Sequence, residues 1–532
     1  MRPHVGGAAV GLLCLALSAM PASAQRTTAE RTNNRETSAY ADVVAFVDSL
    51  QRRGAGLRVR VMGRSTLQRN MPLVIAARPM VFSPSEAHRS GKPIIYLQAN
   101  IHAGEVEGKE AVQMLLRDLT LGALQPLLDS VIVLAVPIYN IDGNERLAAG
   151  DRNRPGQNGP AIVGQRSNGM LLDLNRDYVK AEAPETRAAL ALLDAWDPDV
   201  FVDLHTTNGS YHGYQLTYAP GLNPNPSQVN DWTREQFLPE LRERMRSRHK
   251  RETFWYGNFR NQDPDSLQLG WETYDARPRF GTNWAGLRHR VSVLSEAYSN
   301  AEFGTRIDAT YDFVRELLSL AVEARGTIKS LIIASQFSRP DSVIVRSALA
   351  APTLQPVIAE LSRADGEGSG GSARRKRSGE FRTIRMPVFD RFMAVRKEAR
   401  PAAYFLAPQH DAIAALLQRQ GVAVTRLSRP WSGTAESFGL DSVSASAQAF
   451  EGHRTVTVQG HWRSASAVEL PAGSFLVSTD QPLGLFASYL LEPASEDGVV
   501  TWNMLDRELR PRGDYPIRRV RERPIVVGTE LE

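Results

Sequence analysis

The sequence contains a single cysteine, Cys14, among 532 residues. One thiol excludes a disulfide scaffold and any metal centre built from several thiolates. An excess of one charge sign is also missing, since 63 basic and 58 acidic residues leave a net charge of +5. That charge is too small for this length to argue for nucleic-acid binding. With 42% hydrophobic and 23% charged residues, the composition excludes collagen-like, coiled-coil and wholly disordered proteins.

Long apolar runs are also scarce, and the N-terminal one is short. Residues 1–24 combine an early Arg2, an apolar run at 10–17 and the small residues Ala22-Ser23-Ala24. This pattern is typical of a cleaved secretory signal, and the run is too short for a membrane anchor, which must cross about 30 Å of hydrocarbon. We therefore expect an exported protein, periplasmic or secreted. After cleavage it would have no cysteine and no integral membrane association.

The distribution of apolar segments predicts two domains after a polar, flexible stretch at 25–37. In the first, at 38–335, helical patterns separate continuous apolar runs. Such runs suit strands that are buried on both faces of a sheet. We expect an α/β fold with a mixed, mostly parallel sheet and helices on both faces. The runs lie at 94–97, 131–136, 200–204 and 291–294.

Residues 336–532 differ in character and predict a smaller C-terminal α/β accessory domain. Residues 402–427 resemble a β-α-β unit, and further strand patterns follow. The Gly/Ser-rich stretch at 365–380 carries a basic cluster and predicts a flexible, solvated loop.

Residues suited to metal chemistry follow three of the apolar runs. His102 and Glu105 come directly after the run at 94–97, and His205 ends the run at 200–204. Because open α/β sheets bind ligands at the carboxyl ends of their strands, these side chains are expected to meet. Two histidines and one carboxylate form a catalytic zinc set that leaves a position for water. Glu296 follows the run at 291–294, and burial there would raise its pKa and suit it to proton transfer.

Arginines in two loop segments are candidates for binding a substrate carboxylate, because a guanidinium group binds carboxylates in bidentate geometry. The segments are Asp151-Arg152-Asn153-Arg154 and Asp173-Leu174-Asn175-Arg176. Taken alone, each arginine is better explained as a surface charge.

Together these residues resemble the zinc carboxypeptidase family over about residues 59–317. The resemblance implies that His102, Glu105 and His205 bind one zinc ion and that Glu296 is the general base and then the general acid. It also implies that Asn175 and Arg176 hold the terminal carboxylate of a peptide, while Asp173 orients the first histidine. The motifs, in order, are His-Ala-Gly-Glu at 102–105, Asn-Ile-Asp-Gly at 140–143, Asp-Leu-Asn-Arg at 173–176, Asp-Leu-His at 203–205 and Ser-Glu at 295–296.

Two further roles that the resemblance implies have two candidates each. Arg154, in preference to Arg152, would stabilise the oxyanion, and Arg152 would then contact substrate. Tyr274, in preference to Tyr298, would be the mobile tyrosine that covers the substrate. Gly104 stands where digestive members of the family carry a substrate-contacting arginine, so their specificity does not transfer to this chain.

The sequence thus predicts a secreted zinc metallopeptidase that removes C-terminal residues from peptides. One alternative keeps the metal and changes the bond, giving an amidase or endopeptidase of cell-wall peptides or a deacylase of N-acyl amino acids. Another is a catalytically inactive peptide-binding protein. The intact His-Glu-His set and Glu296 argue against this last reading. The expected partner is a peptide or peptide-like substrate and not a nucleic acid.

Overall fold

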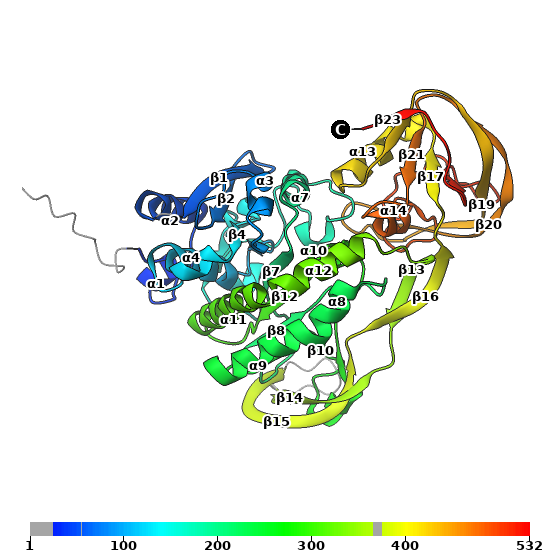
Figure 1. Cartoon of the computed structure of the whole chain (residues 1–532). Helices are drawn as coiled ribbons and strands as arrows, with labels where there is room; N and C mark the ends of the chain where they lie inside the picture. The colour runs from blue at the N-terminus through cyan, green and yellow to red at the C-terminus, as the bar shows by residue number, and fades with distance from the viewer. Residues whose placement is uncertain (1–24, 55, 365–374, 532) are drawn as a thin grey trace, which may run out of the picture.

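The computed structural model describes residues 25–531, except residue 55 and residues 365–374 (Figure 1). The expected signal at 1–24, with Cys14, lies outside the described residues, as does most of the expected loop at 365–380. Among the helices that are described, none has the length and apolar character needed to span a membrane.

An eight-stranded sheet forms the centre of the N-terminal part, in the order β1-β2-β4-β3-β7-β12-β8-β9. β3 pairs in parallel with β4 and β7, and β7 with β12, whereas the β1–β2, β2–β4 and β8–β12 pairs are antiparallel. The predicted mixed α/β sheet is confirmed. Its strands are β1 (Leu57–Arg64), β2 (Asn70–Ala76), β3 (Ile94–Ala99), β4 (Ile132–Val136), β7 (Val200–Thr206), β8 (Leu216–Ala219), β9 (Thr253–Trp255) and β12 (Val291–Ala297).

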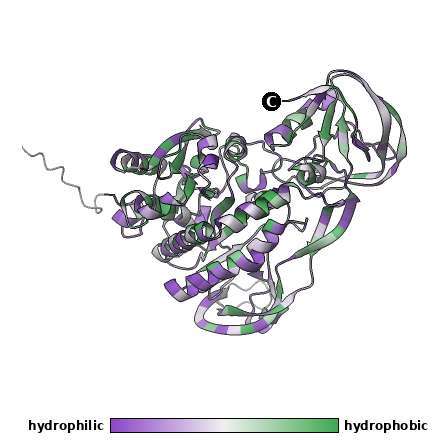
Figure 2. Ribbon diagram, in the orientation of Figure 1, coloured by the Kyte–Doolittle hydropathy of each residue, from purple (hydrophilic) through white to green (hydrophobic). Residues whose placement is uncertain are grey.

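Helices cover both faces of this sheet because its inner strands are apolar on both faces. In β3, Ile94 and Tyr96 pack in one buried cluster, and Ile95 and Leu97 pack in the other. Figure 2 shows the hydrophilic residues concentrated on the outer helices, most clearly on α9. One face carries α3 (Pro84–Arg89), α7 (Pro184–Trp196) and α10 (Gly281–Leu287), and the other carries α2 (Tyr40–Arg53), α4 (Glu107–Leu121), α9 (Leu238–His249), α11 (Phe303–Glu323) and α12 (Arg325–Gln336).

The segment at 25–37, expected to be flexible, is instead held against the domain. It contains the short helix α1 (Thr28–Arg31), where Thr27 and Glu30 form a capping box. Glu30 also accepts a charged hydrogen bond of 2.8 Å from Arg117 of α4. An ion pair to a residue far along the chain fixes this segment, and such a contact leaves no local signal in the sequence.

The chain after α12 does not form one separate domain, although the expected boundary at 335–336 falls at the end of that helix. The hairpin of β14 (Thr353–Ala364) and β15 (Arg375–Phe389) returns to the N-terminal part. There β15 pairs with β11 (Trp271–Glu272), which pairs in turn with β10 (Asn258–Phe259). Residues 375–380 of the expected loop belong to β15. A separate pair, β13 (Ser342–Leu349) and β16 (Phe392–Ala399), leads to the C-terminal sheet.

A second sheet of seven strands forms the C-terminal part, in the order β20-β19-β22-β17-β21-β18-β23. The β-α-β unit predicted at 402–427 is present as β17, α13 and β18, but β21 lies between its two strands and is antiparallel to both. The elements are β17 (Ala403–Leu406), α13 (Asp411–Arg419), β18 (Thr425–Leu427), β19 (Trp431–Ala445), β20 (Val456–Leu470), β21 (Phe475–Ser478), α14 (Gly484–Leu491), β22 (Arg518–Val520) and β23 (Gly528–Glu530).

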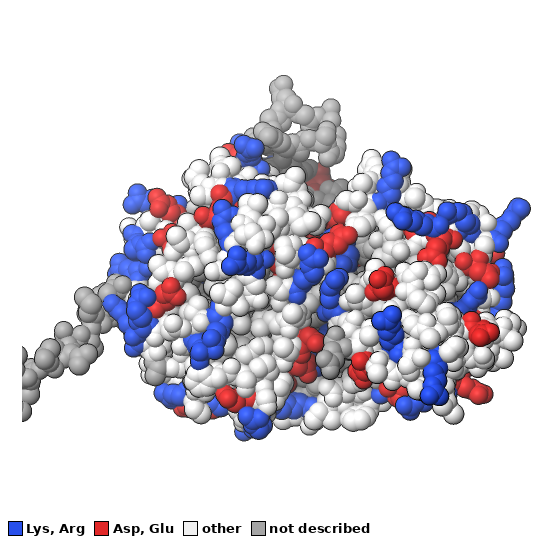
Figure 3. Space-filling view, turned by 90° about the horizontal axis from the view of Figure 1, so that it is seen from above, with Lys and Arg blue, Asp and Glu red and all other residues white. Residues whose placement is uncertain are grey.

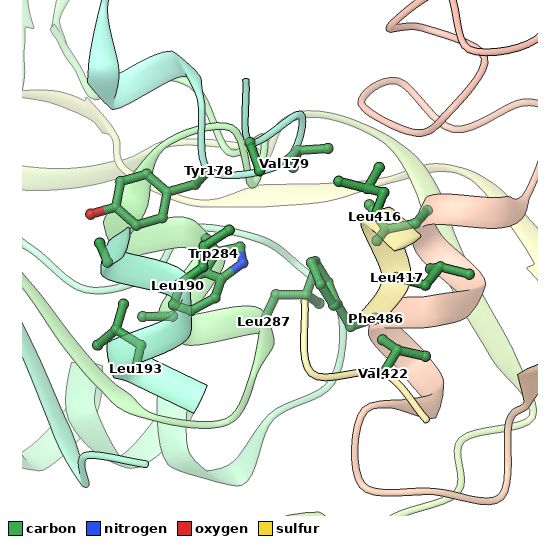
Figure 4. Packing of buried hydrophobic residues seen from close by; sticks show 14 of the residues in the cluster. Tyr178, Val179, Leu190, Leu193, Trp284, Leu287, Leu416, Leu417, Val422 and Phe486 are labelled. Carbon is green, nitrogen blue, oxygen red and sulfur yellow. The ribbon is translucent and has the colours of Figure 1, made fainter. Parts of the chain in front are cut away.

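The two parts share one apolar core, shown in Figure 4. Trp284 and Leu287 of α10 face Leu416 of α13 and Phe486 of α14 across this boundary. Within it, the Gln420 side chain donates to the carbonyl oxygen of Tyr178 and accepts from the indole N–H of Trp284. The N-terminal and C-terminal parts are therefore packed as one body.

The surface seen in Figure 3 carries acidic and basic side chains interspersed with each other. This mixture matches the near-balance of 63 basic and 58 acidic residues in the whole chain. On this face, neighbouring charges of opposite sign limit the long-range field that a polyanion would meet.

Shortening Phe486 tests the shared core. Its ring is 1% exposed, and we expect Phe486→Ala to lower the free energy of unfolding by about 3–5 kcal/mol because it leaves a cavity. Calorimetric unfolding of the full chain measures the change. Phe381 of β15 is 52% exposed, so Phe381→Ala is the matched control, expected to change stability by less than about 0.5 kcal/mol. Equal stability of the two variants would contradict a shared core.

Candidate active site and metal centre

Three neighbouring parallel strands bring the predicted site residues to one edge of the central sheet. His102 lies just beyond the end of β3, and His205 and Glu296 lie near the ends of β7 and β12. In the parallel pairing of β7 with β12, Glu296 stands opposite His205. This is the carboxyl edge of the strands, where open α/β sheets bind their ligands.

A tight turn after β3 directs His102 and Glu105 to the same point. The carbonyl oxygen of His102 accepts the backbone N–H of Glu105, and the Asn100 side chain donates to the carbonyl oxygens of Ala103 and Glu105. A Cβ on Gly104 would lie 3.1 Å from the carbonyl oxygen of Gly164. The turn therefore packs closely against backbone and leaves little room for a long side chain at position 104.

The three predicted metal ligands converge. The Nδ1 atoms of His102 and His205 lie 3.1 and 2.9 Å from the two carboxylate oxygens of Glu105, and 3.2 Å from each other. All three residues are buried, and one ligand atom from each lies within 4.8 Å of the others. Two imidazoles and one carboxylate in this arrangement fit the donor set that holds zinc in hydrolases.

A carboxylate holds the far side of each histidine ring. The Nε2 atom of His102 lies 3.0 Å from Asp173, and that of His205 lies 2.9 Å from Asp203. Such pairs orient an imidazole and leave its other nitrogen for the metal. Asp173 contacts the first histidine, the residue that the family resemblance expects it to orient. Asp203 is not among the predicted site residues. Its position two residues before His205 places it on the same face of the strand, which could have indicated this contact.

The electrostatics of the ligand set favour a cation. Burial alone would raise the pKa of Glu105, but the charge of Arg154 and hydrogen bonds from His102 and His205 outweigh it and keep the pKa well below its usual range. Burial alone would lower the pKa of His205, yet Asp203 and Glu105 hold it well above its usual value. Glu105 is thus held in its ionised form, and the carboxylates beside His205 favour positive charge at that point, both of which suit a bound cation.

Glu296 lines the same cavity as the three metal ligands, and its surroundings suit it to proton transfer. Its side chain is buried, and its Oε2 atom has no hydrogen-bond partner within the described part of the chain. Burial raises the pKa of Glu296 to about 8, and the charge of Glu105 acts in the same direction. His205, Arg154 and Arg166 oppose that rise. A carboxyl group with a pKa near neutrality and a free oxygen suits a general acid–base role.

The structure separates the two arginines that the sequence proposed for the oxyanion. Arg154 lies behind Glu105, 3.2 Å from its carboxylate, and donates to the carbonyl oxygens of Thr206 and Thr207. It is not among the described residues that line the cavity beside the ligands. Arg152 is exposed on the short helix α6 (Gly150–Asn153) and is also outside that lining.

Arg166, which is not among the predicted site residues, lines the cavity where Arg152 and Arg154 do not. It makes a 2.8 Å ion pair with Asp173 and lies 3.4 Å from Glu105. Its side chain is 41% exposed, so part of the guanidinium group remains open toward the cavity. Residue 166 lies in an irregular loop, where no periodicity indicates the direction of a side chain.

Asn175 and Arg176 line the same cavity, as the family resemblance implies. The Asn175 side chain accepts the backbone N–H of Gly281 and lies 3.4 Å from His205. The Arg176 guanidinium lies over the ring of Phe280, 4.0 Å from its centroid. Both side chains are therefore held in place before any ligand arrives.

Two tyrosines line the cavity, Tyr274 and the unpredicted Tyr256. Their ring centroids are 5.7 Å apart, and the Tyr274 hydroxyl donates to Asn283. Tyr298, the alternative to Tyr274, packs 4.2 Å from the His212 ring and is not part of the cavity lining among the described residues. The full lining is His102, Glu105, Arg166, Asn175, Arg176, His205, Thr206, Asn208, Tyr256, Tyr274, Phe280, Thr282, Leu294 and Glu296.

The fold and the buried donor set define a metallohydrolase, and comparison with known proteins gives its family. Residues 43–264 match the family model described as zinc carboxypeptidase. This part of the chain is thus a zinc carboxypeptidase domain, which confirms the resemblance, and the protein is a zinc metallocarboxypeptidase, a hydrolase.

Curated relatives extend the similarity into the C-terminal part. Carboxypeptidase 2 of Trichophyton tonsurans is 24% identical over 465 residues, which are 82% of this chain and 78% of that protein. Carboxypeptidase 2 of Trichophyton rubrum is 24% identical over 468 residues, with the same coverage. Among solved structures, a metallo-carboxypeptidase from Burkholderia cenocepacia is 17% identical and covers 54% of this chain and 69% of its own, with a TM-score of 0.39.

Removing the charge behind His205 tests how the ligand set is held. We expect Asp203→Asn to weaken zinc binding by about 10- to 100-fold, because an amide orients the imidazole less strongly than a carboxylate. Zinc affinity is measured by competition with a chelating dye. Asp506 is exposed, so Asp506→Asn is the matched control. Unchanged affinity in Asp203→Asn would show that the carboxylate has no part in orienting the ligand.

Proposed function

We propose that the enzyme removes single residues from the C-terminal ends of peptides. The proposal rests mainly on one juxtaposition. Glu296, whose Oε2 atom has no hydrogen-bond partner among the described residues, and Arg176 line the same cavity as the His102–Glu105–His205 set. A proton carrier, a metal site and a cation for the terminal carboxylate are the groups that this reaction needs.

Zinc is the metal that the family implies, and the donor set fits one ion. His102, Glu105 and His205 would hold it, with Asp173 and Asp203 fixing the two imidazoles. Bound there, zinc would supply a water of lowered pKa and would polarise a carbonyl group. The protein's own residues would provide the remaining steps.

Glu296 would carry the proton. Its raised pKa lets the carboxyl group accept a proton from the attacking water and pass it to the leaving amine. Arg166 would stabilise the negative charge that develops on the carbonyl oxygen. A preorganised donor of this kind contributes about 3–4 kcal/mol to a transition state.

Asn175 and Arg176 would fix the substrate end. Arg176 offers its guanidinium group to the terminal carboxylate, and Phe280 holds that group in place from below. Tyr274 and Tyr256 would close the cavity around the scissile bond. Holding the substrate at one end provides the orientation that makes attack at the preceding bond effective.

Export of the enzyme stays a proposal from the sequence alone. It is supported by the basic, apolar and small-residue pattern of residues 1–24. Peptides outside the cytoplasm would then be the substrates.

Glu296→Gln tests the proton carrier. An amide cannot accept the proton from water, so we expect kcat to fall by about 10²- to 10⁴-fold while zinc content stays unchanged. Turnover of a dipeptide with a blocked N-terminus and a free C-terminus measures kcat, and elemental analysis measures zinc content. The control is Glu272→Gln on β11, where the carboxylate pairs with Arg260 on the surface. Full activity of Glu296→Gln would remove Glu296 from the mechanism.

Arg176→Ala tests recognition of the terminal carboxylate. For peptides with a free C-terminus, we expect kcat/KM to fall by about 10- to 100-fold, because hydrogen bonds to charged groups contribute about 1.5–3 kcal/mol. For C-terminally amidated peptides the change should be small. Arg152→Ala, at the exposed arginine of α6, is the comparison. Wild-type preference for amidated peptides would instead favour an amidase or endopeptidase.

A further inference from the structure

The connection between β19 and β20 contains a strained turn at residues 450–453. Phe450 and His453 exchange both backbone hydrogen bonds, so Glu451 and Gly452 are the two central residues. Both have positive φ, 49° for Glu451 and 82° for Gly452. Glycine and asparagine are favoured in such a turn, and glutamate is not. A non-glycine residue persists in this region only where contacts of the surrounding structure hold it there.

The Glu451 carboxylate connects the C-terminal part to the N-terminal part. Its Oε2 atom accepts the backbone N–H of Asp173 at 2.8 Å. The flanking residues anchor the same turn. His453 contacts Glu182 at 2.9 Å, and the Phe450 ring lies 5.2 Å from the Arg279 guanidinium. The turn is thus fastened to the N-terminal part at three points, with Glu451 in the middle.

The backbone that Glu451 holds is the beginning of the substrate-binding segment. Asp173 precedes the 3-10 turn η3 (Leu174–Arg176), and its side chain accepts the backbone N–H of Asn175. Asn175 and Arg176 point into the cavity from this turn. The Asp173 side chain is held separately by His102 and Arg166. Loss of the backbone contact would therefore displace mainly the turn that follows, and with it both side chains that face the terminal carboxylate.

A second segment beside the cavity is held in the same way. The backbone N–H of Arg279 donates to Asp497 of the C-terminal part at 2.7 Å, and the two side chains form a buried ion pair. Arg279 leads into Phe280, which supports Arg176, and into Gly281, which binds Asn175. Carboxylates from the C-terminal part therefore fix both backbone segments around the substrate end of the cavity.

We propose that Glu451 is a positioning residue for substrate recognition, through which the C-terminal part sets the place of Asn175 and Arg176. The inference rests on the proposed function of these two residues in holding a terminal carboxylate. It gives the C-terminal part a defined role in the reaction, because substrate affinity then depends on a contact between the two parts of the chain. Glu451 itself touches neither the substrate nor the metal ligands.

Glu451→Gly in the full-length zinc enzyme is the direct test. Glycine suits the positive φ and preserves the turn, while the contact to Asp173 is lost. We expect KM for a peptide with a free C-terminus to rise about tenfold, with kcat within twofold and zinc content and melting temperature unchanged. Glu451→Gln keeps an acceptor oxygen and should restore KM to within threefold of wild type. An unchanged KM in Glu451→Gly, or a loss of zinc, would overturn the proposal.

A merely structural role would give a different result, in which the melting temperature falls and KM does not move. Glu508→Ala is the matched control, because Glu508 pairs with His410 within the C-terminal part. It should leave KM unchanged.

A binding measurement separates this proposal from the proposed function. In the Glu296→Gln background, calorimetric titration with the same peptide needs no turnover, and adding Glu451→Gly should weaken binding about tenfold. If the parent Glu296→Gln protein binds free and amidated peptides equally, the proposed function fails. If the parent discriminates and the added substitution changes nothing, only the positioning role fails.

Discussion

The parallel pairing of β3, β7 and β12 is the constraint on which the rest of the site depends. In this register Glu296 lies opposite His205, and the turn after β3 adds His102 and Glu105 at the same edge. A shift of one residue would turn His205 to the opposite face of the sheet and separate it from Glu105. The buried, two-sided apolar packing of these strands makes such a shift costly.

Gathering charged groups at this edge requires compensation, because burial disfavours an isolated charge. Here each charged or polar group contacts another group that offsets the cost of its burial. The ligand Glu105 contacts both histidines, each histidine is backed by an aspartate, and Gln98 donates to Asp203 from the neighbouring strand β3. Glu296 lies outside this network, and its Oε2 atom has no hydrogen-bond partner within the part of the chain that the structure describes. Burial and the charge of Glu105 raise the pKa of Glu296, whereas Arg154 and the two histidines lower that of Glu105, so the two neighbouring carboxyl groups differ in pKa.

The C-terminal part is joined to this scaffold in three ways. Apolar side chains of α13 and α14 complete the core beneath α10, and carboxylates at 451 and 497 bind backbone N–H groups next to the cavity. The first contact provides stability and the second provides precise placement. The hairpin β14–β15 adds a third connection through β11. Because of these connections, the predicted boundary at 335–336 does not separate two independently packed domains.

The sequence by itself determined the alternation of strands and helices, the two-sided apolar strands and the local motifs that place His102, Glu105, His205 and Glu296 at strand ends. These features are local, since period and spacing express them within a few residues. The tertiary structure decided which arginine faces the cavity, bringing in Arg166 from an irregular loop and placing Arg154 behind Glu105. It alone also joined Glu451 to Asp173, 278 positions earlier in the chain. Contacts of this kind are formed by folding distant segments together, and neither residue carries a local pattern that names its partner.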